Sequence, residues 1–164
     1  MHTFAPIPDP NALIRFRRIS ASLSAIDVQG AGDIMASHIL VVDDDQDHLS
    51  FITELLTRAG YRVTSCPGGA ALAKTLDAVG ATPFDLMLTD LVMPDMDGLE
   101  VLRYVAQRYP GLPMVGMTGL ATDWPVYSRA MEASGACEVF TKPIDVPALL
   151  TALARHLPAQ SSAA

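Results

Sequence analysis

From residue 38 onward, short runs of apolar residues alternate with longer stretches in which apolar residues recur every three or four positions. Short apolar runs are typical of buried strands, and the longer spacing is typical of amphipathic helices. The pattern predicts five strands, at 38–43, 61–65, 85–89, 113–117 and 137–141. It also predicts five helices, at 47–59, 68–79, 98–108, 124–134 and 146–156.

Strands and helices that take turns along a chain favour a parallel sheet covered by helices on both faces. Right-handed crossovers leave few ways to connect such units. We therefore expect an α/β fold with a doubly wound, five-stranded parallel sheet, because an eight-stranded barrel would need a longer chain. The 164 residues suit one domain, predicted at 37–157 and followed by a tail at 158–164.

Residues 1–36 interrupt this pattern and are predicted to be a flexible N-terminal extension. Apolar residues between Phe16 and Ile26 recur at helical spacing, so a short amphipathic helix for a partner or a membrane surface is an alternative. A third interpretation places the natural start of the protein at Met35.

Composition and charge exclude several classes of function. Half of the residues are hydrophobic, yet no apolar run approaches the roughly 18 residues of a membrane span, so no membrane association is predicted. The net charge of −7 disfavours nucleic acid as a partner, because binding its backbone needs clustered Lys and Arg. Two cysteines, Cys66 and Cys137, without nearby Cys/His pairs predict neither a zinc site nor a disulfide framework, which fits the cytoplasm.

Polar residues stand at the ends of four predicted strands. Asp43 and Asp44 follow the first strand and Asp90 the third, while Thr118 and Lys142 follow the fourth and fifth. Parallel strands end at one edge of a sheet, where ligands bind, so these side chains are expected to converge. Crowded carboxylates repel one another unless a hard divalent cation such as Mg²⁺ lies among them. With Asp90 as nucleophile, Lys142 as a positive charge and Thr118 as a hydroxyl donor, the pattern predicts a phosphoryl-transfer site.

Four segments carry a family resemblance: ILVVDDD, DLMLTDLVMPDMDGLEVL, MVGMTG and FTKPID, in that order. Together they resemble the receiver domain of two-component response regulators over about residues 38–157. The resemblance implies a (βα)5 flavodoxin-like fold with strand order 2-1-3-4-5. It also implies signalling through contacts with a downstream protein in the cytoplasm. The predicted last helix has Arg155 as its only fully charged side chain, so a monomer or weak dimer is expected.

The resemblance assigns roles to individual residues. Asp90 would accept a phosphoryl group from a histidine kinase or a histidine phosphotransfer protein, with Thr118 and Lys142 contacting that group and a cis Lys142–Pro143 bond beside it. The implied Mg²⁺ ligands are Asp43, Asp44, Asp90 and Val92, the last through its backbone carbonyl. Only Mg²⁺-dependent self-phosphorylation and slow self-dephosphorylation are expected as reactions of the chain itself. The slow loss is expected because apolar Val92 and Leu120 flank the inferred phosphate and cannot orient a water molecule.

Two alternative functions remain. The first is a receiver cut from a longer transcriptional regulator, which the native chain length would distinguish from a stand-alone receiver. A Mg²⁺-dependent phosphatase of the haloacid-dehalogenase type also forms an aspartyl phosphate, and Asp43-x-Asp45 resembles its motif superficially. That motif requires Thr or Val where this chain has Asp47, so the phosphatase is the weaker hypothesis.

Other residues are given structural interpretations. Asp97 and Glu100 have the spacing of a helix capping box, and Asp45 is expected to support the start of the first helix. Val139 stands where receivers usually place Tyr or Phe, so rotation of an aromatic ring is not expected to carry the switch. The histidines, for which the sequence implies no partner, are expected at the surface: His2, His38, His48 and His156.

Overall fold

The computed structural model describes residues 36–79, 84–94, 96–119 and 124–157. All of them belong to the compact unit Met35–Ala164. The predicted extension, apart from Ala36, and the predicted C-terminal tail therefore lie outside the described residues.

Strands and helices alternate through the described part of the chain. The strands are β1 His38–Val42, β2 Arg62–Cys66, β3 Leu86–Asp90, β4 Met114–Thr118 and β5 Ala136–Thr141. The helices are α2 Gln46–Arg58, α3 Gly69–Val79, α4 Gly98–Arg108, α5 Trp124–Ala133 and α6 Val146–His156. Every predicted boundary lies within about one residue of the observed one, as strong periodicity allows.

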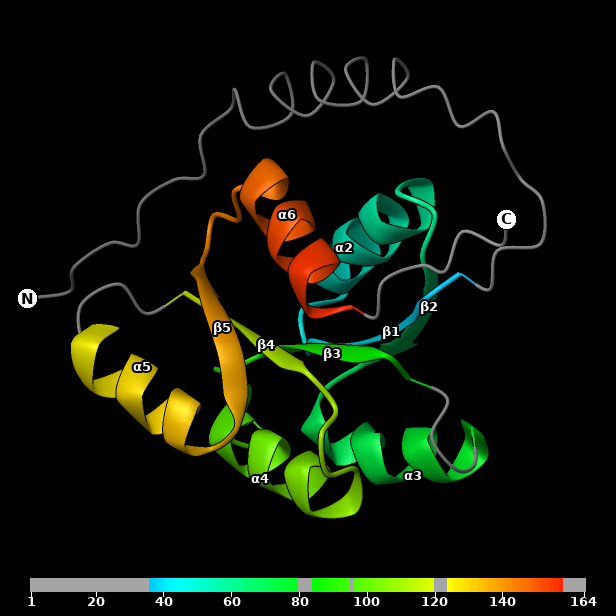
Figure 1. Ribbon diagram of the computed structural model, residues 1–164. Coiled ribbons are helices and arrows are strands. Elements are labelled where there is room, and N and C mark those ends of the chain that lie inside the picture. The colour runs from blue at the N-terminus through cyan, green and yellow to red at the C-terminus, as the bar shows by residue number, and fades with distance from the viewer. Residues whose placement is uncertain (1–35, 80–83, 95, 120–123, 158–164) are drawn as a thin grey trace, which may run out of the picture. The chain divides into compact units, whose positions relative to one another are not determined.

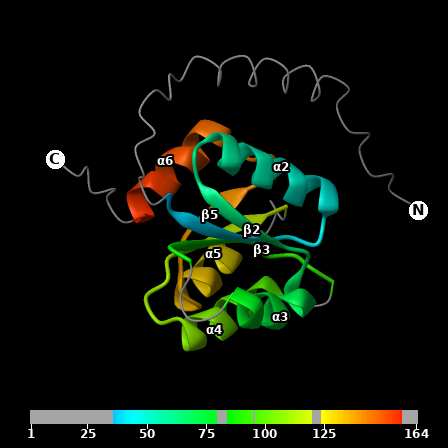
Figure 2. The same ribbon diagram turned by 90° about the vertical axis from the view of Figure 1, so that its right-hand side faces the viewer.

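The five strands form one parallel sheet with the order β2-β1-β3-β4-β5. Helices α2 and α6 cover one face, and α3, α4 and α5 cover the other (Figures 1 and 2). This arrangement confirms the predicted doubly wound sheet. The chain leaves β1 and β3 toward opposite faces, so their carboxyl ends flank the point where the winding reverses, which is where ligands bind in such sheets.

Burial follows the position of each strand in the sheet. All residues of β1, β3 and β4 are buried, whereas the edge strands β2 and β5 keep exposed or half-buried positions. Central strands of a parallel sheet lie under helices on both faces, which explains their continuous apolar runs. The three central strands therefore form a rigid base for the residues just beyond their ends.

Aspartates start three of the helices. Asp45, Asp97 and Asp145 each accept a hydrogen bond from a backbone N–H in the first turn, at 3.0 to 3.2 Å. Such caps satisfy backbone donors that have no partner within the helix. The expected roles of Asp45 and Asp97 at helix starts are confirmed.

Gly98 begins α4 at a position without room for a side chain. A Cβ atom there would lie 2.3 Å from Leu91 Cα and 2.9 Å from the Asp90 carbonyl oxygen. Both neighbours are backbone atoms of the turn that follows β3, so a larger residue would have to displace this turn. The glycine thus permits α4 to pack directly against the residues beside Asp90.

The prediction that His38 lies at the surface is wrong. Its relative exposure is 6%, because it opens the central strand β1 and packs against the ring of Phe84. Arg62 Nη2 lies 2.9 Å from Nδ1, and Thr64 Oγ1 lies 2.8 Å from Nε2. Since a guanidinium only donates, Nδ1 accepts and Nε2 carries the hydrogen that is donated to Thr64.

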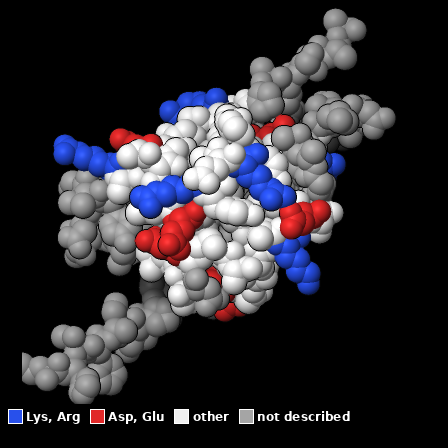
Figure 3. Space-filling model, turned by 90° about the horizontal axis from the view of Figure 1, so that it is seen from below, with Lys and Arg blue, Asp and Glu red and all other residues white. Residues whose placement is uncertain are grey.

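The surface over α3 and α4 carries charges of both signs. Figure 3, which views the molecule from that side, shows Lys and Arg interspersed with Asp and Glu. Arg108 of α4 pairs there with Asp77 of α3. Within the described part of the chain, no helix is long and apolar enough to cross a membrane. Cys66 and Cys137 are both free, and they lie on the two opposite edge strands, β2 and β5.

Candidate functional site

The five side chains predicted to form the site lie at one edge of the sheet. Asp43 and Asp44 follow β1, Asp90 ends β3, Thr118 ends β4, and Lys142 follows β5. The strands β1, β3, β4 and β5 are consecutive parallel neighbours in the sheet. The remaining strand, β2, contributes none of the five side chains. Strand ends separated by tens of residues in sequence therefore meet at the carboxyl edge, as the order of the motifs predicted.

Three carboxylates gather at the centre of this edge. One oxygen atom from each of Asp43, Asp44 and Asp90 lies within 4.8 Å of the others. Asp43 is fully buried and Asp90 is 5% exposed, whereas Asp44 is exposed. Like charges so close together disfavour ionisation unless positive charge compensates them. An all-oxygen donor set of this kind fits a hard divalent cation such as Mg²⁺.

Lys142 supplies positive charge to the cluster. Its Nζ donates to Asp90 Oδ2 at 2.6 Å and to Asp43 Oδ2 at 3.1 Å. Burial alone would lower the pKa of Lys142, but the hydrogen bonds and charges of Asp90 and Asp43 outweigh burial and raise it above its ordinary value. Lys142 is therefore a charged ammonium group placed between the two buried carboxylates.

Asp90 is oriented by the backbone that follows it. Its Oδ1 accepts hydrogen bonds from the N–H groups of Leu91, at 2.5 Å, and Val92, at 3.0 Å. With Lys142 on Oδ2, both oxygens of the carboxylate have fixed partners. The Val92 side chain is 46% exposed beside this carboxylate and offers no polar group.

Thr118 lies at the same edge and is buried, with a relative exposure of 1%. Its carbonyl oxygen accepts a hydrogen bond from the Lys142 backbone N–H at 2.7 Å, next to the pairing of Thr118 with Thr141 in the sheet. This bond fixes the chain at Lys142 relative to the end of β4. The Lys142–Pro143 peptide bond is cis, as the resemblance implied.

Asp43 is held by three donors, one of which the sequence analysis missed. Its Oδ1 accepts from the Asp45 backbone N–H at 3.0 Å, and its Oδ2 lies 2.5 Å from His48 Nδ1 and 3.1 Å from Lys142 Nζ. Burial would raise the pKa of Asp43, but the hydrogen bond with His48 and the charge of Lys142 outweigh burial and lower it.

The prediction that His48 is a surface residue without a partner is therefore wrong, since its side chain is only 18% exposed and contacts Asp43. A signal was present in the sequence. Asp45 caps α2, so His48 belongs to the first turn of that helix, which lies over the end of β1. A polar residue in that turn can reach back to the acids that follow the strand.

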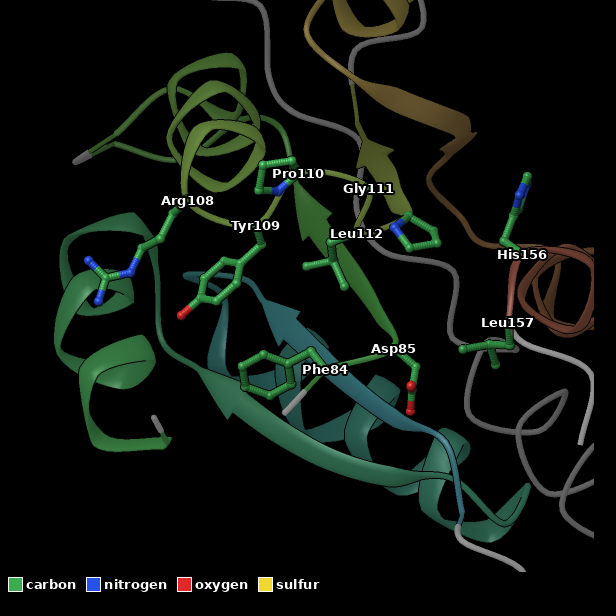
Figure 4. A pocket seen from close by; sticks show the side chains of 10 residues that line it. Phe84, Asp85, Arg108, Tyr109, Pro110, Gly111, Leu112, His156 and Leu157 are labelled. Carbon is green, nitrogen blue, oxygen red and sulfur yellow. The ribbon is translucent and has the colours of Figure 1, made fainter. Parts of the chain in front are cut away.

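A hollow of about 540 Å³ lies at the opposite edge of the sheet (Figure 4). It is lined by Phe84 and Asp85 before β3, by Leu112 and Pro113 before β4, and by Leu157 after α6. Ligands of open parallel sheets bind beyond the carboxyl ends of the strands, whereas this hollow lies at their amino ends. We assign the chemistry to the acidic edge for that reason.

Known proteins are similar to this chain in architecture and in sequence. The family model described as response regulator receiver domain matches residues 39–154. The chain is 34% identical over 119 residues to the response regulator receiver protein CpdR of Brucella abortus (strain 2308), covering 73% of this chain and 95% of that protein. It is 36% identical over 121 residues to the transcriptional regulatory protein ZraR of Klebsiella oxytoca, covering 73% of this chain but only 26% of ZraR. The chemotaxis protein CheY4 of Vibrio cholerae has a similar structure, with a TM-score of 0.65, 27% identity and coverage of 74% of this chain and 99% of CheY4.

These similarities decide between the function classes considered from the sequence. The matches are to receiver domains, and they lend no support to the phosphatase alternative. The sheet order, the acidic edge and the family match over residues 39–154 agree. The chain belongs to the response regulator receiver domain family of two-component signalling.

Proposed function

We propose that Asp90 is the phosphoacceptor of this receiver, and that it takes a phosphoryl group from a phosphohistidine of a histidine kinase or histidine phosphotransfer protein. The observation that carries the proposal is the contact of Asp90 Oδ2 with Lys142 Nζ, at 2.6 Å, inside a cluster of three carboxylates. Of the other acids that follow in the sequence, Asp97 caps α4 and Glu100 is exposed in its first turn, while Asp95 lies outside the described residues.

The residues of the chain suit a transfer that is mainly a matter of positioning and charge. A carboxylate oxygen of Asp90 attacks the phosphorus atom, the phosphorus–nitrogen bond breaks, and the imidazole of the donor leaves with the electron pair. The backbone N–H groups of Leu91 and Val92 hold the other oxygen of Asp90 in place. The Lys142 ammonium and the Thr118 hydroxyl then bind oxygens of the transferred group.

Asp43, Asp44, Asp90 and the Val92 backbone carbonyl would hold Mg²⁺. The spacing of the three carboxylates, within 4.8 Å, supports this set. When bound, Mg²⁺ neutralises charge on the acids and on the phosphoryl oxygens during transfer. In its absence Lys142 compensates only part of the charge of the three acids.

The same geometry supports a slow loss of the phosphoryl group without a partner. Val92 is apolar and exposed beside Asp90, so it cannot orient an attacking water molecule. Leu120, the second residue in this expectation, lies outside the described residues. We expect self-phosphorylation from small phosphodonors and slow self-dephosphorylation, with no turnover of another substrate.

The output proposed is a contact with a downstream protein in the cytoplasm, by a monomer or weak dimer. The net charge of −7 makes a direct interaction with nucleic acid unfavourable. Arg155, a charged residue of α6, pairs with Glu138 of β5 at 2.9 Å, so its charge is engaged within the chain rather than offered to a second copy. Receivers of longer regulators such as ZraR match as well, so a receiver that belongs to a longer regulator is the second candidate.

Acetyl phosphate and Mg²⁺ test the proposal, with the intact mass of the protein as readout. Wild type is expected to gain the mass of one phosphoryl group, and Asp90→Asn is expected to gain none. Asp97→Asn is the matched control, because Asn also caps helices and this acid lies outside the cluster. Phosphorylation of Asp90→Asn to the level of wild type would contradict the assignment.

A further inference from the structure

Three donors contact the carboxylate of Asp43, two of them at Oδ2. Oδ1 accepts from the Asp45 N–H at 3.0 Å, while Oδ2 lies 2.5 Å from His48 Nδ1 and 3.1 Å from Lys142 Nζ. A carboxylate oxygen has two lone-pair sites, so both sites of Oδ2 are used. A cation that binds Asp43 through Oδ2 must therefore displace one of these two donors.

The two donors on Oδ2 differ in what else they bind. Lys142 is shared, and its contact with Asp90, at 2.6 Å, is shorter than its contact with Asp43. His48 Nδ1 has Asp43 as its recorded partner. An ionised carboxylate cannot donate, so Nδ1 carries the hydrogen of this bond. The His48 ring is fixed in the first turn of α2, 6.3 Å from the ring of Phe51.

We propose that His48 is a positioning residue that competes with the divalent cation for Asp43 Oδ2 and thereby sets the cation affinity of the site. This inference rests on the proposed function only through the cation site. An interaction made in the cation-free state and lost on binding stabilises the free state, and so weakens binding by the same free energy. Water replaces part of the lost hydrogen bond, so we expect removal of the donor to tighten binding by about three- to tenfold.

Two substitutions separate the donor from the volume of the side chain. His48→Leu keeps an apolar side chain of moderate size but removes the N–H group. His48→Asn places an amide N–H close to the position of Nδ1 and so conserves the donor. Isothermal titration calorimetry with MgCl₂, on the whole chain and at one fixed pH, should give a dissociation constant about three- to tenfold lower for His48→Leu. His48→Asn should stay within about twofold of wild type.

Asp43→Asn tests whether His48 acts through Asp43. In that background, His48→Leu should leave the Mg²⁺ affinity unchanged, because the competing pair no longer exists. Urea unfolding without Mg²⁺ verifies that each variant is folded, and His48→Leu should be less stable than His48→Asn there.

The inference would be overturned if His48→Leu bound Mg²⁺ no more tightly than wild type does. It would also be overturned if His48→Leu tightened Mg²⁺ binding equally in the Asp43→Asn background, or if wild type bound no Mg²⁺. The proposed phosphoacceptor is tested separately, by the mass gained from acetyl phosphate. Normal phosphorylation, with equal Mg²⁺ affinities for wild type, His48→Leu and His48→Asn, would reject the role of His48 alone. Tighter binding by His48→Leu without phosphorylation would reject the role of Asp90 alone.

Discussion

Removing the charge of Asp44 should stabilise the cation-free protein. An oxygen of Asp44 lies within 4.8 Å of oxygens of Asp43 and Asp90. Because Asp44 is exposed, the dielectric constant of water is the suitable limit, and each pair of unit charges then repels by about 0.9 kcal/mol. Two pairs give about 2 kcal/mol, of which the ammonium of Lys142 offsets about half. We expect Asp44→Asn to raise the free energy of unfolding by about 1 kcal/mol.

Urea unfolding followed by circular dichroism, with and without Mg²⁺, measures this effect. At the proposed cation site, Mg²⁺ would bind the folded wild type and stabilise it, so its addition should reduce or reverse the advantage of Asp44→Asn. Asp47→Asn is the control, because Asp47 is also exposed but lies in the first turn of α2, where negative charge is favourable. That variant should lose a few tenths of a kcal/mol in both conditions. A cation-free Asp44→Asn protein less stable than wild type, or an equal gain from Mg²⁺ in both proteins, would refute the reasoning.

Three further predictions address the glycine, the buried acid and the exposed valine. Gly98→Ala should lower the free energy of unfolding by about 3 kcal/mol, since the added Cβ meets a backbone atom 2.3 Å away. Gly119→Ala is the control: its Cβ has open space around it, so the free energy of unfolding in the same urea assay should change by less than about 0.5 kcal/mol. Asp43 has a lowered pKa in the folded state, so its contribution to stability is present above about pH 4 and is lost as the pH falls through that folded pKa. Asp43→Asn should accordingly flatten the loss of unfolding free energy below about pH 4, and an unchanged slope in urea unfolding at a series of pH values would count against the pairing. Phosphorylated wild type should keep its phosphoryl group for minutes or longer with Mg²⁺ and no partner protein. Val92→Asn should shorten that lifetime several-fold, because the amide can orient an attacking water molecule. The loss is measured by intact mass, and a wild-type half-life of seconds would reject this expectation.

The elements and the edge of the sheet that carries the site could be predicted from the sequence for a physical reason. The central strands are largely apolar because both of their faces are buried. Helices α4 and α6 have strong helical periodicity and begin after Asp97 and Asp145. Once the strands are known to be parallel, Asp43, Asp90 and Lys142 must share one edge.

Contacts that depend on the direction of a single side chain were beyond the same reasoning. His48, in the first turn of α2, reaches the acidic edge, whereas His38, the first residue of β1, is buried at the amino edge. Their environments are set by Asp43 in one case and by Arg62 and Phe84 in the other. Val139 packs against the buried core as a half-buried residue, in agreement with its small side chain, but how the switch operates stays a prediction.

The most direct test of the central claim is to identify the residue that carries the phosphoryl group. An acyl phosphate is electrophilic, so borohydride reduces a phosphorylated aspartate to homoserine and releases phosphate, whereas an unmodified carboxylate does not react. Wild type treated with acetyl phosphate and Mg²⁺, reduced and digested for peptide mass spectrometry, should contain homoserine at position 90. Homoserine at Asp43, Asp44 or Asp97 in place of Asp90, or at no position in a protein that has gained the phosphoryl mass, would contradict the account.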